Sequence, residues 1–168
     1  MKHLLVVLFP LSLAAMTRCQ SGRDLACLAQ VQSISGGMRL DLPSSVGTIR
    51  LPPGAVSEPL GSNPDGRKFI LEDSTVLEIW VTPEPAVGLA ATGGTGAGPI
   101  GSCDTRIGRF AATVTRAALV APSGDSVFVG LLNITLDQQH ALNVAVRTAT
   151  GPSRDAVLNE VPAFLQLR

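Results

Sequence analysis

Three apolar segments in the C-terminal half of the sequence decide the fold: RFAATVTRAALV (109–120), SVFVGLLNITL (126–136) and ALNVAVRT (141–148). They are rich in Val, Leu, Ala, Phe and Thr, a composition typical of β-strands. The connections between them, 121–125 and 137–140, are only five and four residues long. Because short connections between long strands join antiparallel neighbours, the sequence predicts a three-stranded antiparallel meander.

The last of these segments shows the period of two that a strand with one buried face requires. Leu142, Val144 and Val146 are expected to point one way, with Asn143 and Arg147 on the other side. In the segment before it, four apolar side chains share a face: Phe128, Leu132, Ile134 and Leu136. The meander is therefore expected to pack its apolar face against another element.

That element follows directly, because the pattern after the meander is helical. Gly151-Pro152-Ser153 is expected to introduce a helix, with Ser153 as its N-cap and Asp155 in the first turn, where the helix dipole favours an anion. An apolar stripe follows at helical spacing: Val157, Val161 and Phe164. Pro162 should make the helix short or kinked near its end, and residues 165–168 fit a small terminal strand.

Earlier in the chain, residues 67–72 and 75–81 predict a β-hairpin with a tight turn at Asp73-Ser74. Leu77, Ile79 and Val81 alternate with Val76, Glu78 and Trp80, which indicates one buried face. Trp80 is therefore expected to be either partly exposed or covered by another layer.

Shorter elements and loops surround this hairpin. Residues 38–42 and 48–51 are expected to form two short strands, the second ending at Pro52-Pro53-Gly54 because proline offers no amide to a sheet. A polar loop is expected at 59–66, and a long Gly-rich loop at 82–101. The Gly-rich loop lacks the Gly-Lys-Ser/Thr of a phosphate-binding loop, so no nucleotide site is expected there.

The order of these elements predicts an α+β fold, with a C-terminal helix packed on an antiparallel sheet that contains the meander. A β-sandwich with one terminal helix is the alternative. Residues 36–168 are expected to form a single globular domain, preceded by an N-terminal arm or short helix at 16–35.

The first residues have the pattern of an export signal. A short positive region, Met1-Lys2-His3, precedes an apolar stretch from Leu4 to Leu13, and Ala14-Ala15 offers small residues for cleavage. The apolar stretch is shorter than the about twenty residues that a membrane-spanning helix needs. We expect residues 1–15 to be a cleaved signal peptide, extending to residue 18 if Cys19 is lipidated.

The three cysteines, Cys19, Cys27 and Cys103, fit an exported protein in which disulfides persist. Cys19 lies where bacterial lipoproteins carry their acylated cysteine, although the preceding Arg18 departs from that pattern. If Cys19 is lipidated, Cys27 and Cys103 are left to pair. If cleavage falls earlier, a Cys19–Cys27 pair competes; we predict the Cys27–Cys103 disulfide, which would close a long loop and contribute about 4 kcal/mol.

Composition and charge exclude several classes of partner. Thirteen basic and thirteen acidic residues cancel, and neither sign forms a run, so no nucleic-acid footprint is expected. A membrane contact is expected only through a lipidated Cys19. No cluster of residues has the spacing of a metal or cofactor site, and His140 is expected to be a solvated histidine in a turn.

The most concentrated polar group lies next to Cys103. Asp104, Arg106 and Arg109 could face a ligand, because guanidinium groups match the geometry of carboxylate and phosphate. The alternative is that they are surface charges beside a strand.

Three stretches of the sequence together resemble the PsbP-like α-β-α sandwich group. They are the extended segment that runs into Leu51-Pro52-Pro53-Gly54, the stretch Cys103-Asp104-Thr105-Arg106-Ile107-Gly108, and the closing helix and strand of 155–167. The resemblance implies a small, non-enzymatic accessory or binding domain.

Three functional hypotheses follow from the sequence. The first is an exported, non-catalytic module of the cell envelope, periplasm or secreted fraction that binds a macromolecule or small ligand through its loops. The second is a small enzyme of unfamiliar type with a polar cleft around Asp104 and Arg106. The third is a membrane-tethered structural lipoprotein, which depends on Cys19 alone.

Overall fold

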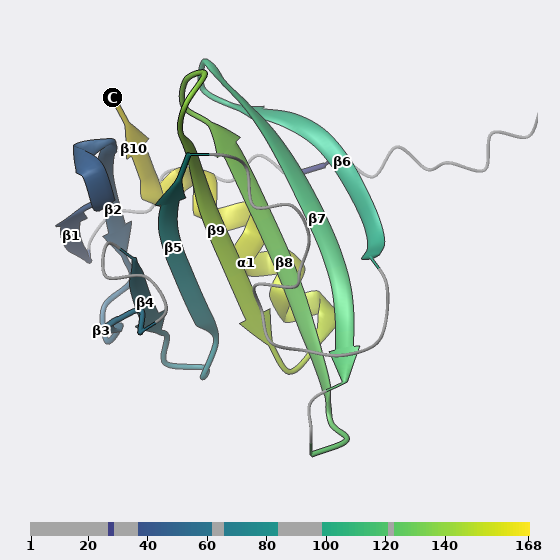
Figure 1. Cartoon of the computed structure of the whole chain (residues 1–168). Coiled ribbons are helices and arrows are strands. Elements are labelled where there is room, and N and C mark those ends of the chain that lie inside the picture. The colour runs from purple at the N-terminus through teal and green to yellow at the C-terminus, as the bar shows by residue number, and fades with distance from the viewer. Residues whose placement is uncertain (1–26, 29–36, 62–65, 84–98, 121–122) are drawn as a thin grey trace, which may run out of the picture.

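Two antiparallel β-sheets and an α-helix make up the part of the chain that the computed structural model describes, residues 27–28, 37–61, 66–83, 99–120 and 123–168 (Figure 1). The smaller sheet consists of β1 (Met38–Asp41), β2 (Gly47–Leu51) and β10 (Leu165–Leu167). The larger sheet consists of β3 (Val56–Pro59), β4 (Arg67–Ile70), β5 (Val76–Thr82), β6 (Pro99–Ile107), β7 (Phe110–Val120), β8 (Ser126–Thr135) and β9 (Ala141–Thr148). A short 3-10 turn, η1 (Pro43–Ser45), joins β1 to β2, and α1 (Gly151–Phe164) precedes β10.

The seven strands of the larger sheet lie in the order β3-β4-β5-β9-β8-β7-β6. Helix α1 crosses one face of this sheet behind β8 and β9, and we call that face the inner face and the opposite one the outer face. The chain therefore has the predicted α+β fold, with a helix packed on an antiparallel sheet. Within the described residues, no helix is long and apolar enough to cross a membrane.

The predicted meander forms the centre of the larger sheet. Strands β7, β8 and β9 pair in sequence, and Leu132 lies opposite Val114 on one side and Val144 on the other. All three side chains are completely buried on the inner face. The period-two pattern therefore identified the buried face correctly.

The start of helix α1 differs from the prediction. Thr150, not Ser153, is the N-cap: its backbone is extended and its Oγ1 accepts a hydrogen bond of 3.2 Å from the Ser153 N–H. Pro152 fits inside the first turn because its missing N–H would have no helical partner there. The helix thus begins before Ser153, and Asp155 lies beyond the first turn.

The helix packs closely on the sheet through the predicted apolar stripe. Val157, Val161 and Phe164 are buried, together with Leu158. A Cβ atom added at Gly130 in β8 would lie 2.4 Å from Leu158 Cδ1, so the helix approaches the strand more closely than any larger residue would allow. The helix ends at Phe164, two residues after Pro162, as the proline predicts.

The smaller sheet joins the two ends of the described chain. Strand β2 pairs with β1 on one side and with β10 on the other, so that Ile49 lies between Leu40 and Leu165. Ile49 and Leu165 belong to the same hydrophobic core as the helix and the inner face of the larger sheet. The short strands at 38–42 and 48–51 and the terminal strand were predicted, but their union in a separate sheet was not.

The Gly-rich segment predicted at 82–101 is shorter than expected at its C-terminal end. Strand β6 begins at Pro99 and runs through Cys103 to form one edge of the larger sheet. A proline is tolerated here because an edge strand has one side without sheet hydrogen bonds, and the pairing register shifts between Pro99 and Gly101. The rest of the loop, 84–98, lies outside the described residues. Strand β3, at the other edge, was not predicted.

The predicted hairpin is present as β4 and β5, which pair from Arg67 with Ile79 to Ile70 with Val76. Leu77 and Ile79 are completely buried on the inner face. Trp80 points to the outer face yet is only 8% exposed, and it packs with Leu131 and Ala145. Strand β5 is therefore buried on both faces, which is the second of the two alternatives for Trp80.

We predict that Leu77→Asp and Ile79→Asp each prevent folding. Either substitution would bury an unpaired carboxylate in the core, at a cost of several kcal/mol against a total stability of about 5 to 15 kcal/mol. Val56→Asp, in the edge strand where Val56 is 56% exposed, is the matched control and should melt like the wild type. Cooperative, wild-type-like thermal melting of the two core variants would show that the face assignment is wrong.

Candidate functional site

The three residues predicted to face a ligand do not converge on one point. Asp104 and Arg106 alternate with the inward-facing Cys103 on edge strand β6, so both lie exposed on the outer face. Asp104 accepts a hydrogen bond of 2.8 Å from the Thr113 hydroxyl of the neighbouring strand. Arg106 donates from Nη2 to the Arg109 carbonyl oxygen over 2.7 Å.

Arg109 occupies a different environment from the other two. It follows Gly108, whose φ of 58° allows the tight turn between β6 and β7. Its guanidinium carbon lies 5.0 Å from the centroid of the Phe110 ring, a cation–π contact that holds the side chain over the end of the sheet. The bond from Arg106 to the Arg109 carbonyl holds the same turn in place.

Arg109 lines a cleft of about 370 Å³ at the end of the sheet where the β6–β7 and β8–β9 turns come together. Four separate segments of the chain form this cleft, which we call the turn cleft. Its lining residues are Ser44, Ser45, Val46, Arg109, Phe110, Leu136, Asp137, His140 and Arg168. One wall therefore comes from the smaller sheet and its η1 turn, and the other from turns of the larger sheet.

The backbone of the η1 turn is unusual on this wall. Ser44 and Ser45 both have a φ of 55°, a left-handed conformation that side chains other than glycine and asparagine rarely adopt. The turn is closed by hydrogen bonds from the Leu42 N–H to the Gly47 carbonyl, 2.9 Å, and from the Ser45 N–H to the Leu42 carbonyl, 3.2 Å. Strained backbone of this kind often occurs at binding sites, where it places side chains that a relaxed turn would not.

His140 and Asp137 form the polar part of the opposite wall. The His140 Nδ1 lies 3.1 Å from each carboxylate oxygen of Asp137, and the Gln139 N–H donates to the same carboxylate over 2.7 Å. The pKa of Asp137 is lowered, first by the Gln139 backbone hydrogen bond and then by His140. His140 is exposed, as predicted for a turn, but it also lines a second, larger and more open cleft of about 550 Å³ with Thr82, Pro83, Gln138 and Gln139.

The sequence analysis named Arg109 as a residue that could face a ligand and expected His140 to be a solvated histidine, and it did not predict the cleft that both residues line. The missing part was the wall made by Ser44, Ser45 and Arg168, which lie far from the two turns in the sequence. The two serines sit in a stretch that reads as an ordinary connection, Pro43-Ser44-Ser45. Only the pairing of β10 with β2 brings Arg168 to this end of the molecule.

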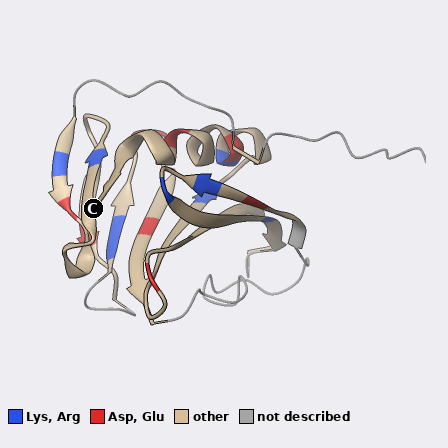
Figure 2. Cartoon of the chain, turned by 90° about the horizontal axis from the view of Figure 1, so that it is seen from above, with Lys and Arg blue, Asp and Glu red and all other residues tan. Residues whose placement is uncertain are grey.

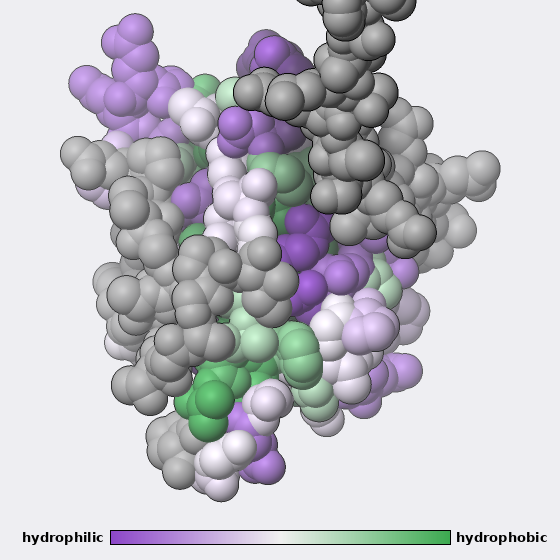
Figure 3. Space-filling view, turned by 90° about the vertical axis from the view of Figure 1, so that its right-hand side faces the viewer, coloured by the Kyte–Doolittle hydropathy of each residue, from purple (hydrophilic) through white to green (hydrophobic). Residues whose placement is uncertain are grey.

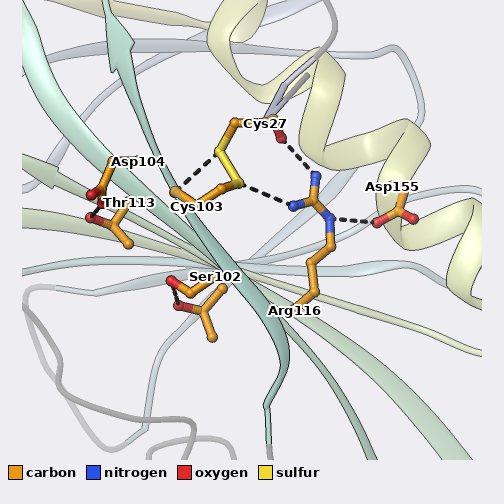
Figure 4. Close-up of a disulfide and its surroundings, with 8 residues drawn as sticks. Cys27, Ser102, Cys103, Asp104, Thr113, Arg116 and Asp155 are labelled. Carbon is orange, nitrogen blue, oxygen red and sulfur yellow. Dashed lines mark hydrogen bonds and ion pairs between the residues drawn. A yellow bond between two sulfur atoms is a disulfide. The ribbon is translucent and has the colours of Figure 1, made fainter. Parts of the chain in front are cut away.

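A second polar cluster surrounds the disulfide, where Arg116 reaches both Cys27 and Asp155 of helix α1 (Figure 4). Cys27 and Cys103 are joined, with their Cα atoms 5.7 Å apart, so the segment at Cys27 is tied to edge strand β6. The Arg116 guanidinium contacts both halves of this link: Nη2 donates to the Cys27 carbonyl over 2.7 Å, and Nη1 lies 3.6 Å from Cys103 Sγ. Cys19 lies outside the described residues.

Asp155 connects this cluster to the helix. Its carboxylate accepts bonds from Arg116 Nε at 3.0 Å and from Arg154 Nε and Nη2 at 2.9 and 3.2 Å. Arg154 is only 5% exposed and also donates to the Ala117 carbonyl of β7 over 3.2 Å. Burial is the strongest influence on the Asp155 carboxyl and would raise its pKa, but the bonds from Arg154 and Arg116 together outweigh it and lower the pKa.

The surface outside these clusters carries both signs of charge. Lys, Arg, Asp and Glu are spread over the strands and the helix, with no large area of one sign (Figure 2). On the side that carries β6 and β7, apolar side chains gather at the lower end and polar ones lie higher (Figure 3). Val120, the last residue of β7, is 46% exposed.

Comparisons with solved structures bear on the fold. The cyanobacterial PsbP of Synechocystis sp. PCC 6803 matches 84% of this chain over 99% of its own length, with a TM-score of 0.55 and 12% sequence identity. The chain is similar in fold to PsbP. A protein of Bacteroides thetaiotaomicron matches 79% of the chain with the same TM-score, 0.55, and 15% identity. The chain spans about half of that protein, 48% of its length.

At these identities the likeness to PsbP shows the architecture and not the site. No family model matches the sequence, and no curated protein matches it. Within the described residues of this chain, the helix lies on the inner face alone.

We predict that Asp155→Asn lowers the free energy of unfolding by about 1 kcal/mol at pH 7, because buried Arg154 loses its charged partner, while solvent screens the 44% exposed carboxylate. The folded-state pKa of Asp155 is lowered, so its contribution is present above its unfolded pKa and is lost as pH falls through the folded pKa. The difference in the free energy of unfolding between the wild type and the variant should therefore become smaller as the pH falls. Urea unfolding at a series of pH values from 7 downward measures it.

Asp41→Asn, at an exposed aspartate of β1, is the matched control for this series. It should unfold like the wild type at every pH. If the difference in the free energy of unfolding between the wild type and Asp155→Asn is the same at neutral and acid pH, the proposed role of the Asp155 charge is contradicted.

Proposed function

We propose that this protein is an exported, non-catalytic binding module that holds its ligand in the turn cleft. The observation that carries the proposal is the convergence of four chain segments, from two sheets, on one cleft at the end of the structure. Loops that are positioned by a rigid scaffold are the usual place for binding residues. Here the scaffold is the buried core shared by both sheets and the helix.

The residues that line the turn cleft are of types that bind small ligands. Arginine, histidine and two serine hydroxyls lie beside apolar side chains of Val46, Phe110 and Leu136. A mostly apolar lining with a few placed polar groups is typical of small-ligand sites. The polar groups would orient a ligand, and the apolar ones would remove part of it from water.

The alternative function is that of an enzyme, because the turn cleft contains residue types found in catalytic triads. Ser44, Ser45, His140 and Asp137 are residue types of a hydrolase triad, and Asp137 already bonds His140 Nδ1. Among the described residues, however, no hydrogen bond joins either serine to His140, and the histidine is exposed. The cleft proposed from the sequence around Asp104 and Arg106 has no counterpart either, since neither residue lines the turn cleft.

A ligand screen separates binding from catalysis. Small molecules of every charge are tested by thermal shift against the wild type and Arg109→Gln, a variant of an exposed side chain that should fold normally. We expect ligands that stabilise the wild type but not the variant, and that mass spectrometry recovers unchanged after long incubation. Chemical conversion of a ligand by the wild type but not by Ser44→Ala or Ser45→Ala would replace the proposal with the enzyme. Stabilisation that does not depend on Arg109 would move binding away from this cleft.

Export is supported by the Cys27–Cys103 disulfide, because such bonds persist outside the reducing cytoplasm. We propose that residues 1–15 direct the chain across a membrane and are then removed. Lipidation of Cys19 would instead remove residues 1–18 and leave a membrane-tethered protein, the third of the hypotheses from the sequence.

Expression of the full chain in a bacterial host tests this proposal by mass and N-terminal sequence. The expected product lies in the exported fraction, begins just after Ala14 or Ala15, and has Cys27 and Cys103 oxidised. Val6→Arg combined with Leu8→Arg interrupts the apolar stretch and should leave a full-length, reduced chain inside the cell. A product that begins at an acylated Cys19 would establish the lipoprotein. A full-length wild-type chain with free thiols would contradict export.

A further inference from the structure

We infer that the ligand of the turn cleft is a small organic acid, whose carboxylate is bound by Arg109 and Arg168 and whose other part is apolar. This inference rests on the proposed function of the cleft and names its class of ligand. Three properties of the lining support it. Arg109 and Arg168 form no ion pair among the described residues, the Asp137 carboxylate is bonded within its own turn, and three of the lining side chains are apolar.

The cations of the cleft lack acidic partners in the described structure. The ion pairs among the described residues join other groups, and none includes Arg109 or Arg168. The Arg109 guanidinium contacts the Phe110 ring by one face, which leaves its N–H groups at the edge of the plane for an anion. Two guanidinium groups beside one cleft match a carboxylate, which accepts hydrogen bonds on both oxygens.

The one acidic residue that lines the cleft does not neutralise these arginines. The Asp137 carboxylate is bonded on its own turn by the Gln139 N–H and by His140 Nδ1. Its partners are therefore local, and none of the ion pairs among the described residues joins it to Arg109 or Arg168. Two arginines therefore line the cleft beside a single acidic side chain whose hydrogen bonds are made within its own turn, which favours an anion over a cation.

The apolar part of the lining selects among anions. Val46, Phe110 and Leu136 line the same cleft, and all three are partly buried against the hydrophobic core. Inorganic phosphate would leave these side chains without a partner, whereas a carboxylate with an aromatic or branched aliphatic group would cover them. A cleft of about 370 Å³ suits a ligand of this small size.

The strained η1 turn fits the same ligand. Ser44 and Ser45 are exposed hydroxyl donors in a turn with positive φ angles, and they line the cleft on the same wall as Arg168, with Arg109 on the other wall. The Arg168 N–H donates to the Val46 carbonyl over 3.1 Å, which fixes Arg168 next to this turn. The two walls thus bring donors from opposite sides to one carboxylate.

Phenylacetate and 3-methylbutanoate are the probes that test this inference. Phenylacetamide is the neutral analogue of phenylacetate, and inorganic phosphate is an anion without an apolar group. Binding to the full chain is measured by chemical-shift titration of its backbone amides. We expect both acids to shift amides of the turn cleft, and to bind about tenfold more weakly to Arg109→Gln and to Arg168→Gln, since each variant loses a charge-assisted hydrogen bond. Arg39→Gln, an exposed arginine of β1 outside the cleft, is the matched control and should bind as the wild type does.

The outcomes distinguish this inference from the proposed function. Phenylacetamide or phosphate binding as tightly as the acids would overturn the inference, and so would acid affinities that are the same in wild type and both cleft variants. A neutral or cationic ligand that binds the cleft in an Arg109-dependent way would overturn the inference but retain the proposed function. If no ligand of any charge depends on Arg109, both fail.

Discussion

The carboxylate of Asp155 joins helix α1 to the larger sheet through two arginines. It bonds Arg154 on its own helix and Arg116 on β7, and Arg116 continues to the carbonyl of Cys27. Through the Cys27–Cys103 disulfide the same junction reaches edge strand β6. An edge strand pairs on one side only, so these links restrain the part of the sheet that is least supported.

The position of the turn cleft depends on that restraint. Arg109 lies in the turn between β6 and β7, and it can face the η1 turn only if both strands keep their place relative to the helix. Arg106 adds a local restraint by donating to the Arg109 carbonyl. The disulfide cluster and the turn cleft therefore involve the same two strands, β6 and β7, and the likeness to PsbP concerns the fold alone.

Much of the architecture could be predicted from the sequence because its signals are local. The meander shows a period of two with short connections, and the helix shows an apolar stripe that ends near Pro162. The predicted start of the helix was wrong because Thr150 and Ser153 are both good N-cap residues. In the structure the Ser153 N–H donates to the Thr150 hydroxyl, so Thr150 caps the helix. Strand β6 was not predicted because Pro99 and Gly101 are typical of loops, and an edge position with a register shift accommodates them.

The cleft could not be predicted for a different physical reason. Its two walls meet because β10 pairs with β2 rather than with the larger sheet, and no local pattern specifies which distant strand a three-residue segment will join. A signal was nevertheless present at Arg109, which has no acidic residue among its immediate neighbours in the sequence. Arg116 and Arg154 found acidic or carbonyl partners in the folded chain, whereas the described structure gives Arg109 an aromatic ring and a cleft. A cation that the fold positions but does not neutralise is better explained by a ligand than by stability, because an exposed charge over a ring contributes little to folding.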